Sequence, residues 1–353
     1  MEKNADTSFL ARLNLIRNQL NGINYKSKYN PLDKFKTNSK FEKNSFIKTY
    51  FPFDNHYEFR QKIFNIIKNN PEFRTNPYQT EMSSSQMKDL LHRQMKILVR
   101  EVDKFLPFKE LRNDPIKFGM FMEAINHMDI GLSVRFAFHS ILYYNSLVFL
   151  GTEKHKIFIE KSLSLEDIGC FGLTELGHGS NVRSVKTTAH YDEKLKEFVL
   201  NTPSQEAYKW WIGGAGRTSN MAIIFAQLYT KGSCYGVHAF LVPIRDKGDH
   251  MPFPGVVLGD TGPKVGNDSI DNGFIAFHNY RVHKDALLDK FSSVDDDGQF
   301  SSSISNPDTR FATALGALSE GRVGVGIGSQ VRISAKIYTN IYLFRNFPHY
   351  FKT

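Results

Sequence analysis

The sequence predicts an α+β protein, with a helical N-terminal domain followed by a central β-barrel or β-sandwich domain. After residue 83, apolar residues recur at three- and four-residue steps, which is the spacing of one helix face. Beyond residue 169, short β-branched and aromatic runs are separated by turn residues, a pattern typical of a compact barrel or sandwich. The order of the two patterns, helices first and strands second, favours the α+β class.

Three helices are expected in the first half. Ser83 fits an N-cap and Gln86 the third position of a capping box, so a helix begins there, and Pro107 is expected to end it. Gly151 fits the C-cap of the last of two further helices, which are expected over residues 116–128 and 132–150.

A hairpin is expected where two β-rich runs, 185–191 and 197–201, flank the polar connection 192–196. Turn residues separate the remaining β-rich runs from one another. Further strands are therefore expected over residues 220–228, 235–244, 256–258 and 274–280.

The composition excludes several classes of site. The 353 residues include only two cysteines, Cys170 and Cys234, so neither a disulfide scaffold nor a C-x-x-C motif is expected. None of the twelve histidines stands in an H-E-x-x-H pattern, and we expect no metal site. The longest apolar stretch is interrupted by Arg135 and His139, so no membrane span is expected.

The formal net charge is +9, and much of the excess comes from lysines in the first fifty residues. Such a run is compatible with a nucleic-acid or anionic membrane partner. No recognised nucleic-acid module accompanies it, so we interpret it as a solvated face and expect no nucleic-acid partner.

Two segments carry the strongest functional signal. Residues 170–181 place Thr174 after a short apolar run and then open into a Gly-His-Gly-Ser turn, and residues 209–214 present two adjacent indoles before two glycines. Either segment alone is also compatible with a buried strand and an ordinary glycine turn. Together they suit a large flat ring, with aromatic surface on one side and small donors at its polar edge. Paired in this order, they predict a flavin site.

These segments also carry a family resemblance. The chain resembles the peroxisomal acyl-CoA oxidases, within the wider acyl-CoA dehydrogenase fold, and is most similar to the branched-chain (pristanoyl-type) oxidase. The resemblance runs in order from about residue 31 to about residue 330. Besides the two flavin segments, it rests on residues 31–35, 70–73, 150–155, 256–260, 271–274 and 321–323.

The resemblance implies FAD as the cofactor, contacted by Thr174 and Gly213, with Trp211, Gly214 and Ser180 as weaker flavin or substrate candidates. It also implies α,β-dehydrogenation of a fatty acyl-CoA to the trans-2-enoyl-CoA. In that reaction a base removes the α-proton, flavin accepts hydride, and molecular oxygen is reduced to hydrogen peroxide. A peroxisomal location and a homodimer of the full-length form are implied as well.

The residue patterns and the family resemblance together suggest how the chain is divided into domains. An N-terminal extension (1–30) precedes the helical domain (31–168), the β-domain with the flavin segments (169–290) and an acidic, serine-rich loop (291–308). The last part, 309–353, is expected to begin a C-terminal helical bundle that is cut short.

No catalytic residue is assigned, because the family's base is a glutamate deep in the C-terminal bundle. The last acidic residue here is Glu320, which stands well before that position. A second interpretation is therefore a catalytically inactive truncated form that acts as a partner or regulator of full-length oxidase. A third, an acyl-CoA dehydrogenase, is disfavoured because residues 210–214 resemble the oxidase version.

The N-terminal residues contain a candidate targeting signal. Arg12-Leu13, five residues and then Gln19-Leu20 match the pattern R-L-x₅-Q-L, which resembles an N-terminal peroxisomal targeting signal. An ordinary amphipathic helix would show the same apolar face. The final three residues, 351–353, are not a Ser-Lys-Leu-type signal.

Overall fold

The structure is a computed structural model that describes residues 45, 49, 56–73, 81–316 and 318–346. The chain forms two compact units, Met1–Asn44 with Ser334–Thr353, and Ser45–Ile333. All the elements that build the site lie in the second unit. The R-L-x₅-Q-L motif at residues 12–20 lies outside the described residues. No helix in the described part is long and apolar enough to cross a membrane.

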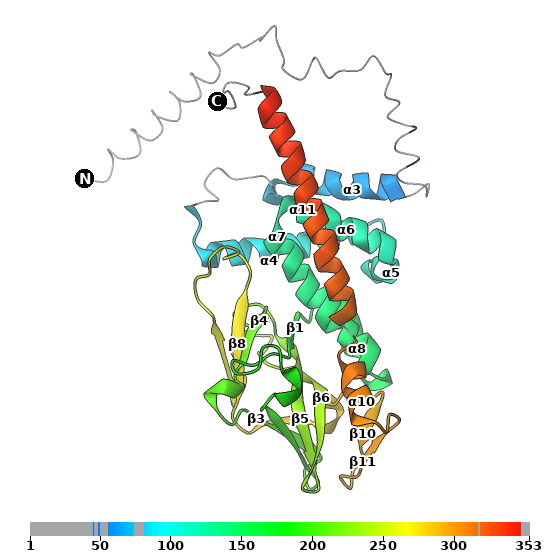
Figure 1. Cartoon of the computed structure of the whole chain (residues 1–353), viewed down its shortest axis with the longest axis vertical. Helices are drawn as coiled ribbons and strands as arrows, with labels where there is room; N and C mark the ends of the chain where they lie inside the picture. Colours follow the sequence, from blue (N-terminus) through cyan, green and yellow to red (C-terminus); the bar gives the residue numbers. More distant parts are fainter. Residues whose placement is uncertain (1–44, 46–48, 50–55, 74–80, 317, 347–353) are drawn as a thin grey trace, which may run out of the picture. The chain divides into compact units, whose positions relative to one another are not determined.

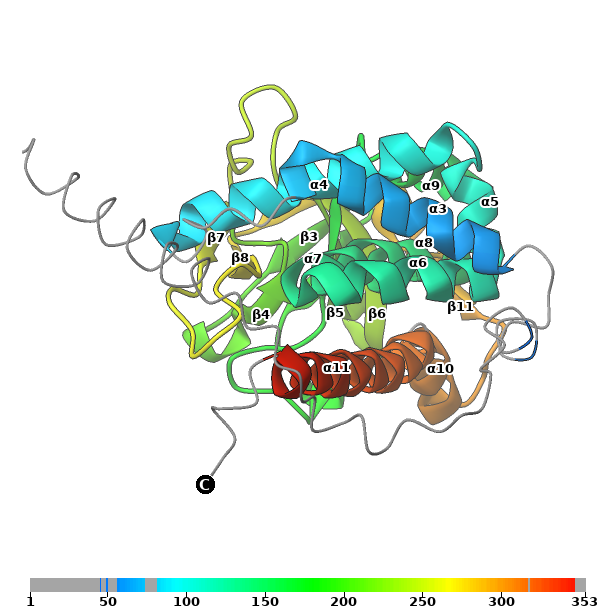
Figure 2. The ribbon, with the colours of Figure 1, turned by 90° about the horizontal axis from the view of Figure 1, so that it is seen from above.

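Helices make up the first half of the unit Ser45–Ile333 (Figures 1 and 2). They surround a core of aromatic and aliphatic side chains, in which Phe121 and Phe136 meet edge to face with ring centroids 5.2 Å apart. The helices are α3 (His56–Asn69), α4 (Ser84–Asp103), α5 (Phe108–Asn113), α6 (Pro115–Met128), α7 (Ile130–Phe136), α8 (Tyr144–Leu150) and α9 (Lys156–Leu163).

The predicted capping box is confirmed. Ser83 Oγ accepts from the Gln86 amide at 3.2 Å, and Gln86 Oε1 accepts from the Ser83 amide at 2.8 Å. The predicted end of this helix at Pro107 is wrong, because α4 ends at Asp103. The Asp103 carboxylate accepts from the Phe108 amide at 2.9 Å, and this bond stabilises the turn into α5, whose N-cap is Pro107.

The helix predicted over residues 132–150 is confirmed as a helical rod, but its middle is not α-helical. A π-helical turn, η4 (Ala137–Tyr143), connects α7 to α8. Gly151 is the C-cap, as predicted, although its φ of −81° is not left-handed. A Cβ at this position would collide with the carbonyl oxygen of Leu147, so close approach explains the glycine.

The β-rich part consists mainly of two sheets. The mixed six-stranded sheet contains β1 (Gly169–Gly172), β2 (Thr188–Asp192), β3 (Glu197–Asn201), β5 (Met221–Thr230), β6 (Ser233–Pro243) and β9 (Tyr280–His283). The second sheet has the order β4-β8-β7, with β4 (Lys209–Gly213), β8 (Asn272–Phe277) and β7 (Val256–Asp260). The predicted barrel or sandwich is thus a curled mixed sheet packed against a smaller one.

The long strand β5 organises the larger sheet. Antiparallel β6 covers one edge, while β1 and β2 share the other edge, both parallel to β5. The hairpin of β2 and β3 is confirmed, but its first strand begins at Thr188 rather than at Val185. The amides of Lys186 and Thr187 donate to the Glu175 carboxylate, so they do not form hydrogen bonds between strands.

The larger sheet is buried on both faces. Cys170, Ile224 and Phe240 pack towards the smaller sheet, in one cluster with Ile275 and Phe277. The alternate residues of β5 pack instead against the π-helical turn and α8, whose side chains fill a separate cluster. The expected helix-then-strand order is confirmed, while the domain boundaries at residues 168 and 290 stay a prediction.

The segment expected to be an acidic loop contains a short hairpin, β10 (Ser292–Val294) and β11 (Phe300–Ser302). The Asp295 carboxylate accepts from the amides of Asp297 and Gln299, so the acidic residues form the turn of this hairpin. The chain then enters α10 (Pro307–Ala314) and α11 (Leu318–Asn346), which agrees with the predicted helical segment after residue 309.

Candidate functional site

The two segments singled out in the sequence lie side by side. The Trp210 amide donates to the Thr174 carbonyl at 3.1 Å, and the Thr174 hydroxyl donates back to the Trp210 carbonyl at 2.9 Å. Thr174 is only partly buried. Because the hydroxyl proton is already donated, any further hydrogen bond to this oxygen is one that it accepts.

The two indoles have different environments. Trp210 stacks on Phe274, with ring centroids 5.8 Å apart and planes inclined by 13°. Trp211 has a φ of +66° and is 54% exposed. The pairing of β4 with β8 shifts register between Lys209 and Ile212, and this bulge turns Trp211 out of the sheet. A large apolar ring in a disfavoured conformation at the surface is typical of a ligand contact.

Gly213 faces a helix. A Cβ added to Gly213 would overlap Cε2, Cδ2 and Cζ of the Phe138 ring, on the π-helical turn. Gly214 has a φ of +91°, and its amide donates to the Asp271 carbonyl at 2.5 Å. The glycine pair therefore allows β4 to approach the π-helical turn closely and then to turn sharply.

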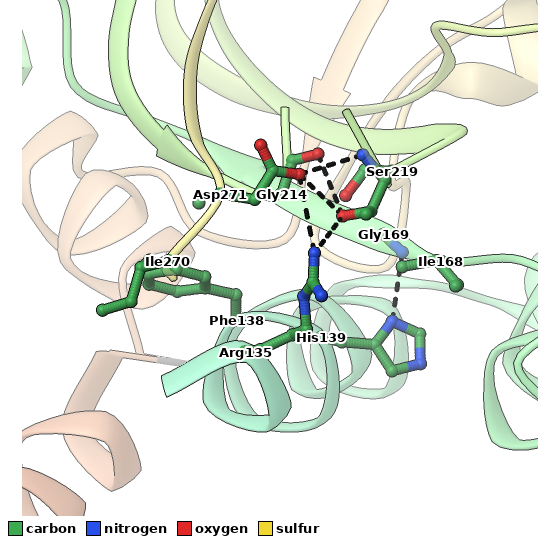
Figure 3. A pocket seen from close by; sticks show the side chains of 11 residues that line it. Arg135, Phe138, His139, Ile168, Gly169, Gly214, Ser219, Ile270 and Asp271 are labelled. Atoms are coloured by element: carbon green, nitrogen blue, oxygen red, sulfur yellow. Dashed lines mark hydrogen bonds and ion pairs between the residues drawn. The ribbon is translucent and has the colours of Figure 1, made fainter. Parts of the chain in front are cut away.

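A small, mainly apolar pocket adjoins Gly213 and Gly214 and also contacts Arg135 and Asp271. Figure 3 shows its lining side chains. Arg135 and Asp271, both buried, approach to 3.8 Å, and Asp271 Oδ2 accepts from the amide and hydroxyl of Thr218. The cavity measures about 10 Å³, which is enough for one water molecule and far too small for a flavin. Gly213 and Gly214 line it, whereas Thr174, Trp211 and Ser180 do not.

Ser180 lies on the exposed Gly-His-Gly-Ser turn. The amide of Gly177 donates to the Glu206 carbonyl at 2.9 Å, which fastens the first part of the turn. A side chain at Gly179 would meet open space. The turn is thus accessible to a ligand.

A fully buried ion pair was missed by the sequence reasoning. Lys209 Nζ lies 3.0 Å from Glu175 Oε1, and neither side chain is exposed to solvent. Burial lowers the pKa of Lys209 to about 8, although the charge of Glu175 offsets part of the effect. Burial by itself raises the pKa of Glu175, but Lys209 and the hydrogen bonds from Thr187 and Lys186 outweigh it and hold that pKa below its usual value. At neutral pH the pair is therefore ionised.

An apolar cavity of about 660 Å³ lies between α6, α7 and the first half of α11. Glycines of α11 line it, with apolar side chains from all three helices and from the π-helical turn, including Phe118, Met122, Val134, Ile141, Val325 and Val331. Gly328 approaches Asn126, whose Nδ2 would lie 2.8 Å from an added Cβ, but Gly326 faces open space. The glycine-rich run of α11, residues 324–328, is thus close-packed only in part.

One carboxylate lines this cavity in the described part of the chain, that of Glu123. Arg60 binds it through two nitrogens, at 2.9 and 3.2 Å, so the carboxylate is already neutralised. No cluster of three or more potential metal ligands occurs among the residues that the structure describes.

Comparison with known proteins gives a consistent picture. The family profile "Acyl-CoA dehydrogenase, middle domain" matches residues 170–280. The chain is 36% identical over 268 residues to human peroxisomal acyl-coenzyme A oxidase 3, covering 76% of this chain and 38% of that protein. It is 38% identical over 299 residues to the peroxisomal acyl-coenzyme A oxidase 2 of Arabidopsis thaliana, covering 82% and 43%.

Solved structures agree. Acyl-CoA oxidase-2 of Caenorhabditis elegans, in a crystal structure bound with FAD, ascaroside-CoA and ATP, superposes with a TM-score of 0.69 at 29% identity. That match covers 79% of this chain and 40% of the other. The chain thus spans about two fifths of the length of the relatives it matches.

Proposed function

We infer that the chain belongs to the acyl-CoA oxidase family over the part that it shares with its relatives. From this premise we propose that it binds FAD beside Thr174 and Trp211 and acts in the oxidation of fatty acyl-CoA. The reaction is the conversion of acyl-CoA to trans-2-enoyl-CoA, with molecular oxygen reduced to hydrogen peroxide. FAD, when bound, supplies the hydride acceptor and transfers the electrons to oxygen. The peroxisomal names of the relatives support a peroxisomal location.

The observation that carries the proposal is an exposed indole next to a fixed hydroxyl. Trp211 offers an apolar face of the kind that a flat ring covers, and Thr174 offers an acceptor beside it for an N–H at the ring edge. The residues present therefore fit a flavin. For Gly213 we propose a contact through its backbone, since the space where a side chain would point is filled by Phe138.

The apolar cavity is the proposed site of the acyl chain. Its volume of about 660 Å³ lies within the usual range of about 300–1,000 Å³ for small-molecule sites. Ala137 and Ile141 line the cavity, while Phe138, on the same π-helical turn, packs on Gly213. The turn thus forms a wall shared by the cavity and the ring site, which supports an acyl group reaching towards the flavin.

Titration of the purified chain with FAD, followed by tryptophan emission and by calorimetry, tests the proposal. Trp211→Ala should weaken binding by at least about fivefold, because a stacked aromatic pair contributes about 1 kcal/mol beyond its buried area. The control is Met251→Ala, which removes another exposed apolar side chain from a loop. Absence of FAD binding, or equal affinity of both variants, would contradict the proposed site.

A second function, that of a non-catalytic partner or regulator of oxidase subunits, is favoured by one observation. The carboxylate of Glu123 is held by Arg60 and is poorly suited to remove a proton. Peroxide release with straight-chain and 2-methyl-branched acyl-CoA thioesters separates the two functions. Binding of FAD and thioester without peroxide supports the partner role. Reduction of an electron-transfer flavoprotein in place of oxygen supports a dehydrogenase.

A further inference from the structure

The ammonium of Lys209 donates to three acceptors in two different parts of the chain. It donates to Glu175 Oε1 at 3.0 Å, to the Phe225 carbonyl at 2.6 Å and to the Leu173 carbonyl at 3.3 Å. Phe225 belongs to β5, whereas Leu173 and Glu175 flank Thr174 on either side. The two residues that border the candidate ring contact are therefore held by one buried cation.

The carboxylate of Glu175 is equally committed. It accepts from the Lys186 amide at 2.6 Å, from the Thr187 amide at 2.9 Å and from the Thr187 hydroxyl at 2.6 Å. These bonds connect the Thr174 segment to the chain just before β2. Residues 173–175, 186–187, 209 and 225 thus meet at one ion pair that is closed to water.

The position of this pair relative to the ring contacts is direct. Glu175 forms a β-bridge with Lys209, and Thr174 exchanges two hydrogen bonds with Trp210 in the adjoining position. Trp211 follows at once, at the bulge. The ion pair therefore lies directly beside the paired residues Thr174 and Trp210, and Lys209 stands two residues before Trp211.

We propose that Glu175 and Lys209 are positioning residues, and that their ion pair fixes Thr174 and Trp211 in the arrangement that receives the ring of FAD. The inference rests on the proposed flavin binding and deepens it. Fold stability alone does not explain the pair, because desolvation makes a buried ion pair no more stabilising than well-packed neutral residues. What the pair adds is a directional connection between two ligand-contacting segments.

A neutral variant of similar shape, Glu175→Gln with Lys209→Met, tests the inference in the full chain. Glutamine Oε1 still accepts from the Thr187 amide and hydroxyl, while its NH2 group replaces the oxygen that accepts from the Lys186 amide. Methionine fills the space of the lysine stem, so the variant should fold with a moderately lowered thermal midpoint. We expect its affinity for FAD to fall by about 10-fold, comparable to the loss when the supporting partners of metal ligands are removed.

The matched control neutralises another ion pair, Lys154–Asp289, as Lys154→Met with Asp289→Asn. This pair has a similar separation of 2.8 Å and connects the turn before α9 to the loop after β9, without contacting Thr174, Trp210 or Trp211. Its FAD affinity should stay within about twofold of wild type. Equal losses of affinity in the control and in the Glu175–Lys209 variant would overturn the positioning role.

The pH profile gives a readout that a merely structural role would not move. Glu175 is the ion-pair partner of Lys209 in the described part of the chain, and burial lowers the pKa of Lys209 to about 8. Above that pKa the ammonium loses its proton and the pair is broken. Wild-type FAD affinity should therefore fall between pH 7 and pH 9, while the neutral variant should give a flat profile. A wild-type profile that stays flat would contradict the inference.

A measurement without cofactor separates this inference from the proposed function. In a Trp210→Phe background Trp211 is the only tryptophan, since the chain has two. Acrylamide quenching of Trp211 in the apo protein should change when the Glu175–Lys209 pair is neutralised and stay constant in the control. If wild-type protein fails to bind FAD but Trp211 quenching responds, the proposed function fails and the positioning role stands. If neither quenching nor affinity responds, the positioning role fails.

Discussion

Replacing Gly213 by alanine distinguishes a packing role of this glycine from a purely ligand-binding one. The added methyl would overlap three carbons of the Phe138 ring, all inside the 3.0 Å limit that real Cβ contacts respect. An aromatic ring cannot bend out of the way as a flexible chain end does, so either β4 or the π-helical turn must shift. Overpacking of this kind costs about 1–3 kcal/mol, and three overlapping atoms place Gly213→Ala towards the upper end.

Thermal unfolding measures this cost. In a large domain the midpoint of thermal unfolding falls by about 2–4 °C for each kcal/mol of lost stability. Gly213→Ala should therefore lower the thermal midpoint by several degrees. Combining Gly213→Ala with Phe138→Ala should cost less than the two single losses added together, by about 0.5–3 kcal/mol, because the smaller side chain leaves room for the methyl. That non-additivity identifies Phe138 as the source of the strain.

Gly119→Ala is the matched control, since an added Cβ there meets nothing within 4 Å and the residue lies inside α6. The same substitution should stabilise the protein by about 0.5–1 kcal/mol, through helix propensity. The reasoning is refuted if Gly213→Ala is as stable as wild type, or if the double-variant cycle with Phe138→Ala is additive.

Two further predictions concern titrating groups. The ring of His139 accepts from the Gly169 amide at Nδ1 and contacts the Ser162 carbonyl through Nε2, and burial lowers its pKa to about 4. This folded-state pKa lies below the ordinary value of 6.5, so between pH 4 and pH 6.5 the unfolded chain binds more protons than the folded chain. The free energy of unfolding should therefore be highest above pH 6.5 and should fall as the pH decreases towards 4. Denaturant unfolding at several pH values should give a smaller slope for His139→Gln than for wild type. Burial also raises the pKa of the Cys170 thiol to about 12, whereas Cys234 is exposed, so a thiol reagent should modify one cysteine in the native protein and two after unfolding.

Local features were predictable from the sequence, because a few neighbouring residues determine them. The capping box of Ser83 and Gln86 and the hairpin connection at residues 192–196 are complete within the segments that they organise. The parallel pairing of β1 and β2 with β5 was not predictable in this way. It depends on strands about fifty and forty residues apart, whose apolar runs would satisfy several pairings equally well.

The π-helical turn illustrates a second limit. Residues 132–150 show ordinary helical spacing, and no proline or glycine within 137–143 indicates a change of pitch. The side chains of this turn contact parts of the chain that are distant in sequence. Phe138 packs on Gly213, and Tyr143 lies where a side chain of Gly169 would project. Ile141 lines the apolar cavity. A wider turn at a site wall agrees with the tendency of π-helical turns to lie at functional positions.

The candidate site shows why sequence reasoning found the ring contacts but missed their support. Thr174 and Trp211 stand in conspicuous surroundings, beside glycines and a second indole, whereas Glu175 and Lys209 look like ordinary surface charges next to a turn. Their burial follows from the pairing of residue 174 with residue 210, which brings a carboxylate and an ammonium together across 34 positions of sequence. Most of their other partners are backbone groups, of Leu173, Lys186, Thr187 and Phe225, which have no residue-type signature. A ligand contact can thus be recognised by its own chemistry, but the pair that orients it is visible only once the strands are paired.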